Sequence, residues 1–358
     1  MKTINTSPAA PKSFSSLLVI IAIALALSVG IWYLLEQTKS PLKYAGATDT
    51  IVFGVETSLL TAPIWIAENK GYFQEQGINV EIKEFDSGRA ALTAMLKEGN
   101  PDNLDMVTAA QTPVMFNSFE RDDYAIISTM VTSTNEQRIL ARKNSGILSP
   151  ADLKGKKVGV TKSSTGHYFL HLFLANHKLA DADVEMVGLK TGELVQAIVD
   201  GKVDAISTWE PHLSNSKKQL AENGLLMEVN YLLRTDFYFI PNKDLIASNP
   251  EVLEKFLRAI EQAEQFIEDN RVEAVTIVSE RLKLDKAQVD ALWDNYNYQL
   301  ALDQSILRTL ENEAQWAMEN NLTAATKVPD YRNYISAEAL KKVKPEAVKI
   351  IIPVDIRI

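Results

Sequence analysis

The chain has 358 residues, enough for two domains of ordinary size, each with its own core. A formal net charge of −9 and a sequence pI of about 5.2 argue against general nucleic-acid binding. The absence of cysteine excludes disulfides, thiolate metal sites, cysteine nucleophiles and a lipid-modified N-terminal cysteine.

An uncharged apolar run at 14–35 is the first predicted element, and two lysines precede it. A helix of this length spans a bilayer core, so we expect a signal anchor with 1–13 in the cytoplasm and 36–50 as an outer linker. The sequence at 24–26 resembles a signal-peptidase site, so a cleaved signal peptide is the alternative. The apolar run continues past that site, which favours retention. Both interpretations predict an exported globular part.

From residue 51 onward the chain alternates strand and helix patterns. Apolar or alternating runs predict strands at 51–56, 78–85, 104–110 and 124–131, and again at 156–161, 183–189, 203–209, 225–230 and 236–242. Capping residues such as Thr61, and either Asp86 or Ser87, begin the predicted helices between them, and Gly71 and Gly99 end two of them. From Pro250 to about Leu322 the periodicity is wholly helical. The expected fold class is α/β with mostly parallel sheets.

The pattern restarts in the middle of the chain, which predicts two lobes. We expect lobe 1 to comprise 51–135 plus 236–358, and lobe 2 to comprise 136–235. Because the chain passes between the lobes twice, it forms a hinge, and the cleft between the lobes is the expected ligand site.

Three loops precede predicted helices at the carboxyl ends of strands: 86–89, 109–112 and 163–167. The free N–H groups of helix N-termini carry partial positive charge and bind oxyanions, and small residues let a ligand approach them. Helix capping alone is the alternative for each loop. Because the three loops stand at matched positions in the two lobes, together they predict a ligand-binding site. The candidate ligand-binding residues from these loops are Ser87, Gly88, Ala110, Gln111, Ser163, Ser164, Thr165 and His167.

Carboxylates also end strands that face the predicted cleft. Trp209 and Glu210 follow one strand, and Glu56 with Ser58 follows another. An aromatic face beside a carboxylate suits an amine-bearing ligand end. The alternative is that Trp209 packs in a core and that lysines balance the acids. If the functional interpretation holds, the ligand is zwitterionic or amine-bearing.

The sequence contains little that indicates catalysis or metal binding. His167 and His171 have the i,i+4 spacing of a zinc pair, but the intervening glutamate of a zinc hydrolase and a third ligand are missing. We expect no metal, no cofactor and no enzymatic activity.

Five segments in order resemble the nitrate/sulfonate/taurine-type substrate-binding proteins of ABC importers, a periplasmic-binding-protein-like type II family. They are APIWIAENKGYFQEQGINVEI, FDSGRAALTAMLKEG, GKKVGVTKSSTGHYFL, GELVQAIVDGKVDAISTWEPH and NPEVLEKFLRAIEQAEQFIEDN. The resemblance covers about 51–335; it departs from the family at an insertion-like NPDN, 100–103.

The resemblance implies a two-lobed fold and a solute-binding role on the periplasmic side of the inner membrane. It also implies a small sulfonate- or taurine-like ion as ligand, with permease and ATPase subunits as partners. A membrane-anchored sensing receptor and a binder of an aminopyrimidine-type thiamine precursor are the alternatives.

Overall fold

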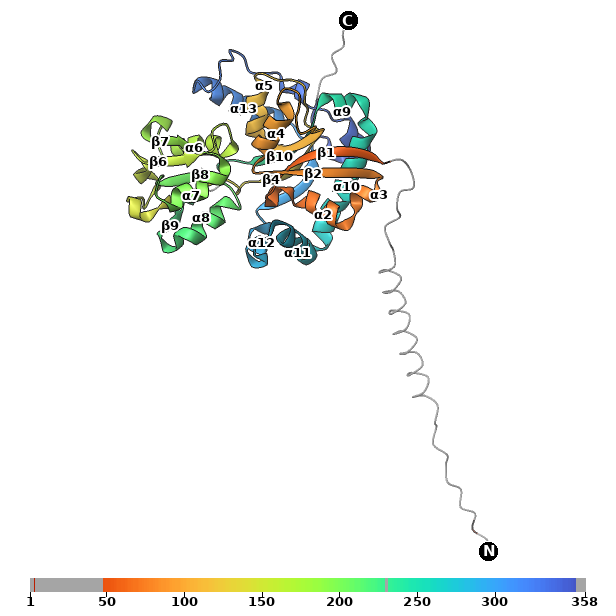
Figure 1. The fold of residues 1–358 in the computed structure, drawn as a ribbon, viewed down its shortest axis with the longest axis horizontal. Helices are drawn as coiled ribbons and strands as arrows, with labels where there is room; N and C mark the ends of the chain where they lie inside the picture. The colour runs from red at the N-terminus through yellow and green to blue at the C-terminus, as the bar shows by residue number, and fades with distance from the viewer. Residues whose placement is uncertain (1–2, 4–47, 229–230, 352–358) are drawn as a thin grey trace. The chain divides into compact units, whose positions relative to one another are not determined.

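The computed structural model describes residues 3, 48–228 and 231–351. Residues 45–358 form one compact unit, and its strands form a six-stranded and a five-stranded sheet (Figure 1). The predicted signal anchor at 14–35 lies outside the described residues. No helix in the described part of the chain combines the length and apolar character needed to cross a bilayer.

The six-stranded sheet is mixed rather than mostly parallel. Its strands, in spatial order, are β11 (Tyr296–Ala301), β4 (Ser128–Ser133), β10 (Thr235–Pro241), β3 (Met106–Ala110), β1 (Asp49–Glu56) and β2 (Ile78–Phe85). β1 pairs in parallel with β2 and β3, whereas β10 and β11 pair antiparallel to their neighbours. The prediction of parallel sheets was wrong because β10 enters this sheet from the other one, against the direction of β3.

The five-stranded sheet is also mixed. Its strands, in spatial order, are β7 (Glu185–Gly188), β6 (Lys157–Val160), β8 (Ala205–Thr208), β5 (Arg138–Arg142) and β9 (Gly224–Leu226). β6 pairs in parallel with β7 and β8, and β5 pairs antiparallel to β8 and β9. The chain leaves the six-stranded sheet after β4 and returns at β10. Whether the two sheets move as lobes with the predicted boundaries stays a prediction.

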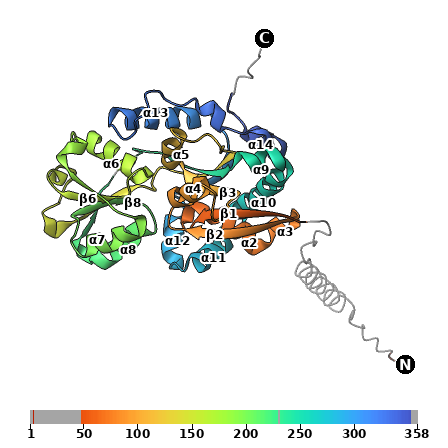
Figure 2. The same ribbon diagram turned by 45° about the horizontal axis from the view of Figure 1, so that its top comes forward.

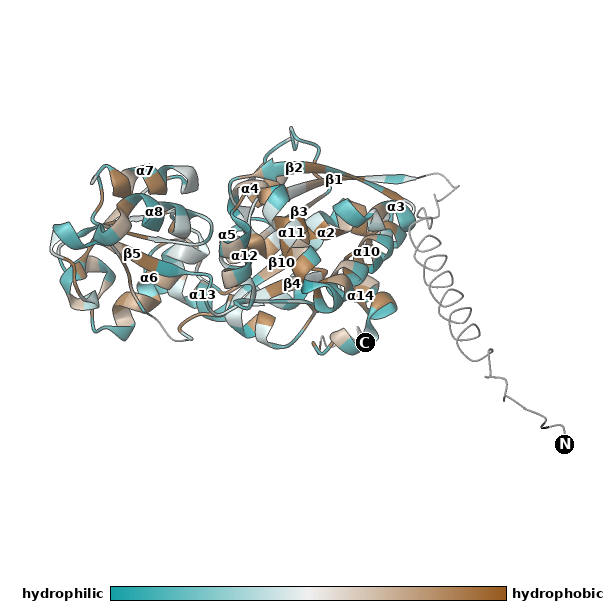
Figure 3. Ribbon diagram, turned by 90° about the horizontal axis from the view of Figure 1, so that it is seen from below, coloured by the Kyte–Doolittle hydropathy of each residue, from teal (hydrophilic) through white to brown (hydrophobic). Residues whose placement is uncertain are grey.

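Helices cover both faces of each sheet (Figure 2). Around the six-stranded sheet they are α2 (Ala62–Lys70), α3 (Tyr72–Glu75), α4 (Gly88–Leu96), α5 (Gln111–Ser118), α9 (Lys243–Ser248), α10 (Pro250–Asp269), α11 (Arg271–Leu282), α12 (Lys286–Trp293), α13 (Ser305–Glu319) and α14 (Glu338–Val343). The five-stranded sheet has α6 (Thr165–Asn176) on one face and α7 (Leu194–Val199) with α8 (His212–Leu220) on the other. Figure 3 shows apolar strands enclosed between these helices.

Helix α2 illustrates how the sequence sets a boundary. Thr61 is its N-cap, and Pro63 lies in its first turn, where a proline removes no helical hydrogen bond. Gly71 ends the helix with a φ of 75°, a left-handed conformation that glycine adopts without strain. These boundaries confirm the prediction.

Two strands escaped prediction. β11 interrupts the region expected to be wholly helical, and its Tyr296, Tyr298 and Leu300 alternate with more exposed residues, which is the strand period. That signal is present in the sequence, although long helices on both sides obscure it. Only four residues separate β5 from β4, at the crossing from the six-stranded sheet, so no long connection marks β5 as a separate strand.

Helix α13 connects the two sheets on one side. Its Trp316 ring lies 5.2 Å from the ring of His167 and 4.8 Å from that of Tyr168, both on α6, measured between centroids. Its Glu313 is fully buried beside Thr112, in the first turn of α5. Burial raises the pKa of Glu313 to about 8, although the side chains of Thr112 and Gln111 oppose the shift.

This buried acid predicts a pH-dependent stability. Between about pH 4.5 and 8 the unfolded chain releases the Glu313 proton while the folded chain keeps it, so stability falls as the pH rises. Glu313→Gln removes this loss. We expect the variant to gain roughly 2 kcal/mol or more in unfolding free energy over the native chain from pH 5 to pH 9, at about 1.4 kcal/mol per pKa unit. Urea unfolding at both pH values measures the gain, with exposed Glu311→Gln on the same helix as the control. Equal gains for both variants would contradict the assignment.

Candidate functional site

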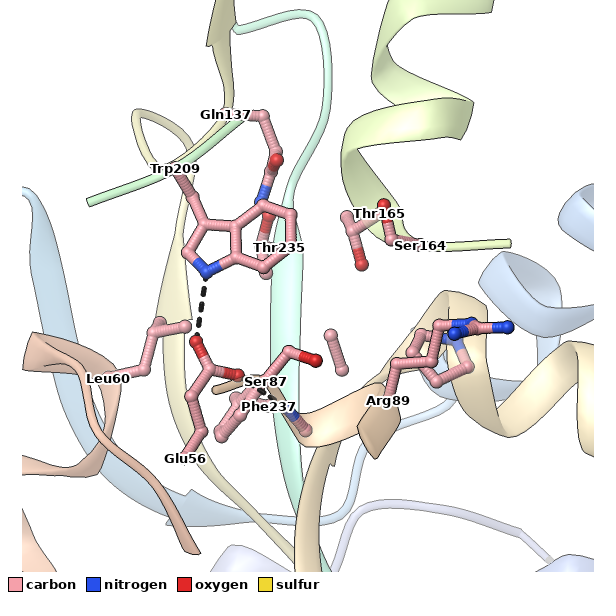
Figure 4. Close-up of a pocket in the computed structure, with 13 residues that line it drawn as sticks. Glu56, Leu60, Ser87, Arg89, Gln137, Ser164, Thr165, Trp209, Thr235 and Phe237 are labelled. Atoms are coloured by element: carbon pink, nitrogen blue, oxygen red, sulfur yellow. Dashed lines mark hydrogen bonds between the residues drawn. The ribbon is translucent and has the colours of Figure 1, made fainter. Parts of the chain in front are cut away.

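A pocket lies where the carboxyl ends of strands from both sheets meet (Figure 4). Its empty space is about 320 Å³, including the part open to solvent. Its lining residues come from β1 and the helical turn after it, the end of β3, the starts of α4, α5 and α6, the segment before β5, the residue after β8, and β10. They are Glu56, Leu60, Ser87, Gly88, Arg89, Ala110, Pro113, Gln137, Ser164, Thr165, Trp209, Thr235 and Phe237.

Glu56 joins the two sheets inside this pocket. Its Oε2 accepts a 2.7 Å hydrogen bond from the backbone N–H of Gly88, the first residue of α4. Its Oε1 accepts a 2.9 Å hydrogen bond from the indole N–H of Trp209, which follows β8 of the five-stranded sheet. Figure 4 shows both contacts on one carboxylate. The buried Glu56 side chain, at the end of β1, is therefore hydrogen-bonded both to α4 and to the residue that follows β8 of the other sheet.

Gly88 is required by the close packing of α4 on β3. A Cβ atom at this position would stand 2.7 Å from Ala109 Cα and 2.8 Å from the carbonyl oxygen of Thr108, and neither backbone atom moves easily. Ser87 precedes it as the N-cap and accepts from the N–H of Ala90 at 3.2 Å. The missing side chain brings the α4 N-terminus against the sheet, within reach of Glu56.

The surroundings of Glu56 shift the pKa of its carboxyl. Burial raises its pKa to about 7, while the hydrogen bonds from Gly88 and Trp209 oppose the shift. The carboxyl therefore titrates near neutral pH. A neighbouring cation favours its ionised form, and a neighbouring anion favours the protonated form.

Two buried polar groups of the lining have no partner within the described residues. They are the hydroxyl of Thr165, in the first turn of α6, and the amide oxygen of Gln137, before β5. Both side chains are at least 95% buried. A buried polar atom without a hydrogen bond is costly, so both positions suit a ligand or an ordered water. Nearby Ser164 is engaged, since its hydroxyl donates to Thr161 O and accepts from His167 N.

The pocket brings together seven of the twelve predicted ligand-binding residues and leaves five outside its lining. The five are Ser58, Gln111, Ser163, His167 and Glu210. Gln111 instead bonds the backbone of Arg234 and Asp236 on the approach to β10. Glu210 accepts from the backbone N–H of Ser214 in α8. The ligand roles of all twelve stay predictions.

His167 differs from its expected place. Rather than being exposed to the site, its side chain is 96% buried and packs against Trp316. Burial, aided by Lys162 and His171, lowers its pKa to about 4, so it is neutral at pH 7. Ser163, with a φ of 59°, donates its N–H to the His167 ring at 3.3 Å.

Sequence reasoning did not select six lining residues: Leu60, Arg89, Pro113, Gln137, Thr235 and Phe237. Arg89 ends the predicted loop 86–89 and Pro113 directly follows the predicted loop 109–112, so the same argument could have selected both. Gln137, Thr235 and Phe237 lie at the two crossings between the sheets, a placement that depends on tertiary structure. Among the described residues, no group of three or more His, Asp or Glu could hold a metal ion.

Comparisons with known proteins agree with this geometry. The model of the family described as "NMT1/THI5 like" matches residues 60–274. A putative aliphatic sulfonates-binding protein of Bacillus subtilis is 28% identical over 68% of this chain and 73% of its own length. A putative binding protein of Brucella abortus is 26% identical over 63% and 69% respectively.

Among solved structures, the alkanesulfonate-binding protein of Xanthomonas axonopodis pv. citri, bound to MOPS, superposes with a TM-score of 0.69. It is 18% identical, and the match covers 82% of this chain and all of that one. At this identity the likeness concerns the fold. The family resemblance read from the sequence is confirmed.

The hydrogen bond between the sheets predicts a measurable pKa change. Trp209→Phe removes the indole donor that favours the ionised form of Glu56, so we expect the pKa of Glu56 to rise by about one unit. Carboxyl-carbon NMR titration measures it. Trp65→Phe is the matched control, because the buried Trp65 indole N–H has no partner in the described structure. An unchanged titration in Trp209→Phe would contradict the contact.

Proposed function

The chain belongs to the NMT1/THI5-like family, and from this premise we propose that it is the extracytoplasmic solute-binding component of an ABC importer. It binds a small sulfonate- or taurine-like or related ion between its two sheets and presents the solute to permease and ATPase subunits. The observation that carries the proposal is the pocket itself, which both sheets line and in which two buried polar groups have no partner among the residues that the structure describes.

The pocket has the properties of a site for a small polar molecule. Hydroxyls of Ser87, Thr165 and Thr235 and the side chain of Arg89 surround the empty space, while Leu60 closes one side. A ligand that contacts residues of both sheets stabilises the arrangement in which the sheets approach one another. The family relatives named as sulfonate-binding or binding proteins support this role.

The proposal includes attachment to the membrane. The apolar run at 14–35 would hold the protein at the periplasmic face as a signal anchor, with secretion after signal cleavage as the alternative. N-terminal sequencing of the exported protein distinguishes them. We expect a start at or near Met1; a start near Leu27 would establish cleavage instead.

Ligand binding is tested with residues 45–358, which form one compact unit. Calorimetry with taurine, ethanesulfonate, nitrate and an aminopyrimidine should identify at least one ligand. Thr165→Val, which keeps the side-chain size but loses the unpartnered hydroxyl, should weaken that ligand at least tenfold, or about 1.4 kcal/mol.

Thr129→Val is the control for this substitution. Its hydroxyl is also buried and unpartnered among the described residues, but Thr129 lies in β4 outside the pocket lining. Equal affinities of the two variants would contradict a role for Thr165, and failure of the native chain to bind any of the four compounds would contradict the proposed function.

A further inference from the structure

The anion site expected at the α4 N-terminus is already occupied by the protein. The Gly88 N–H, the first amide of that helix, donates to Glu56, and Trp209 supplies a second donor to the same carboxylate. These are the donors that a bound oxyanion would otherwise use. An anionic ligand head entering here would therefore meet a carboxylate rather than free N–H groups.

Two further acids surround Glu56. Glu136, in the segment between β4 and β5, is 99% buried, and the neutral hydroxyl of Tyr296 is the hydrogen-bonding group beside its carboxyl. Burial is the main cause that raises the pKa of Glu136, and the nearby carboxyls of Glu210 and Glu56 raise it further. Burial also raises the pKa of Glu210. Three buried acids thus share one region beside the pocket.

The groups that face Glu136 from other elements do not neutralise this region. From β11, Tyr296 and Tyr298 present hydroxyls, which are uncharged at neutral pH. From β5, the half-buried Arg138 lowers the pKa of Glu136, but its guanidinium donates to a backbone carbonyl and an amide oxygen rather than to a carboxylate. Arg138 therefore serves Glu136 and Glu210, whereas Glu56 is held by neutral donors, and a further cation would be stabilised here.

Gln137 provides independent evidence of the kind of ligand group that the pocket binds. Its side chain lines the pocket, is 95% buried, and has an amide oxygen without a donor among the described residues. An amide oxygen accepts hydrogen bonds but cannot donate them. Together with Glu56, it offers acceptors to a ligand group that carries N–H bonds and positive charge.

The outer side of the site has the opposite character. Arg89 lines both this pocket and an adjoining groove, whose other lining residues include Lys162 and Lys190. None of the three forms an ion pair with a carboxylate of the described residues. Glu193 also lines the groove, but its carboxylate accepts the backbone N–H of Lys190, and Asp86 stands at the edge near Gly192. The groove therefore suits an anionic group.

We infer that the ligand is a small zwitterion that enters amine first. Its protonated amine contacts Glu56 and Gln137 at the inner end, in the field of Glu136 and Glu210, and its anionic group lies outside near Arg89, Lys162 and Lys190. This inference rests on the proposed function and specifies the ligand class of the same site.

Three compounds on a two-carbon skeleton test it with residues 45–358: taurine carries both charged groups, ethanesulfonate lacks the amine, and ethylamine lacks the sulfonate. We expect taurine to bind at least tenfold more tightly than either of the others. Calorimetry at pH 7 in phosphate and in Tris, whose ionisation enthalpies differ, should also show proton release, because a bound cation ionises carboxyls that are partly protonated beforehand.

Glu136→Gln tests whether the carboxyl of Glu136 stabilises the protonated amine of the ligand, and it removes no group that lines the pocket. We expect it to weaken taurine at least tenfold, to reduce proton release, and to leave ethanesulfonate binding within twofold. Glu222→Gln, at an exposed site of the five-stranded sheet's α8–β9 connection, is the matched control and should change neither quantity. The proton measurement on the native chain needs no variant, so the test stands even if Glu136→Gln does not fold.

Ethanesulfonate binding as tight as that of taurine, or taurine binding without proton release, would overturn the inference and leave the proposed function intact. An unchanged taurine affinity in folded Glu136→Gln would overturn the assignment of the field to Glu136. If none of the three compounds binds, the inference fails; if nitrate and the aminopyrimidine also fail to bind, the proposed function fails with it.

Discussion

The carboxylate of Glu56 is the constraint on which the arrangement of the site depends. It ends β1 of one sheet, accepts the first amide of α4, and receives the indole N–H of Trp209 from the other sheet. A buried carboxylate needs such donors, because burial without hydrogen bonds disfavours its charged form strongly. The donors in turn need the carboxylate: Gly88 lies too close to β3 to carry a side chain that could fill the space. One side chain thus accepts the hydrogen bond of the α4 N-terminus and also makes the contact between the two sheets.

The two connections between the sheets differ in chemistry. On the α13 side, Trp316 packs against the rings of His167 and Tyr168, an apolar contact that pH near neutrality does not change, since His167 is already neutral. On the pocket side, the Glu56–Trp209 contact depends on a group that titrates near pH 7. The first is suited to a permanent joint, and the second to a contact whose strength varies with what occupies the pocket.

Local signals in the sequence were sufficient for several helix ends and for seven of the residues that line the site. Thr61, Ser87 and Gly71 mark helix ends by backbone chemistry that acts within a few residues, so the sequence reveals them directly. Trp209 was found because it follows a strand. Gln137 was not, because its place in the pocket results from the crossing between sheets rather than from a local pattern. Ser87 and Ser164 also cap their helices, so capping and pocket lining proved compatible rather than alternative.

The same geometry couples the charge of a ligand to the contact between the sheets. Glu56 accepts two N–H donors best as a carboxylate, and with a pKa raised to about 7 it is only partly in that form at neutral pH. A cation in the pocket lowers the pKa of Glu56 and strengthens its bond to Trp209, whereas an anion raises the pKa and weakens that bond. Because the bond spans the two sheets, ligands of opposite charge act on their approach in opposite directions, even if both fit the space. Selection in this pocket therefore depends on the sign of charge that Glu56 meets as well as on shape.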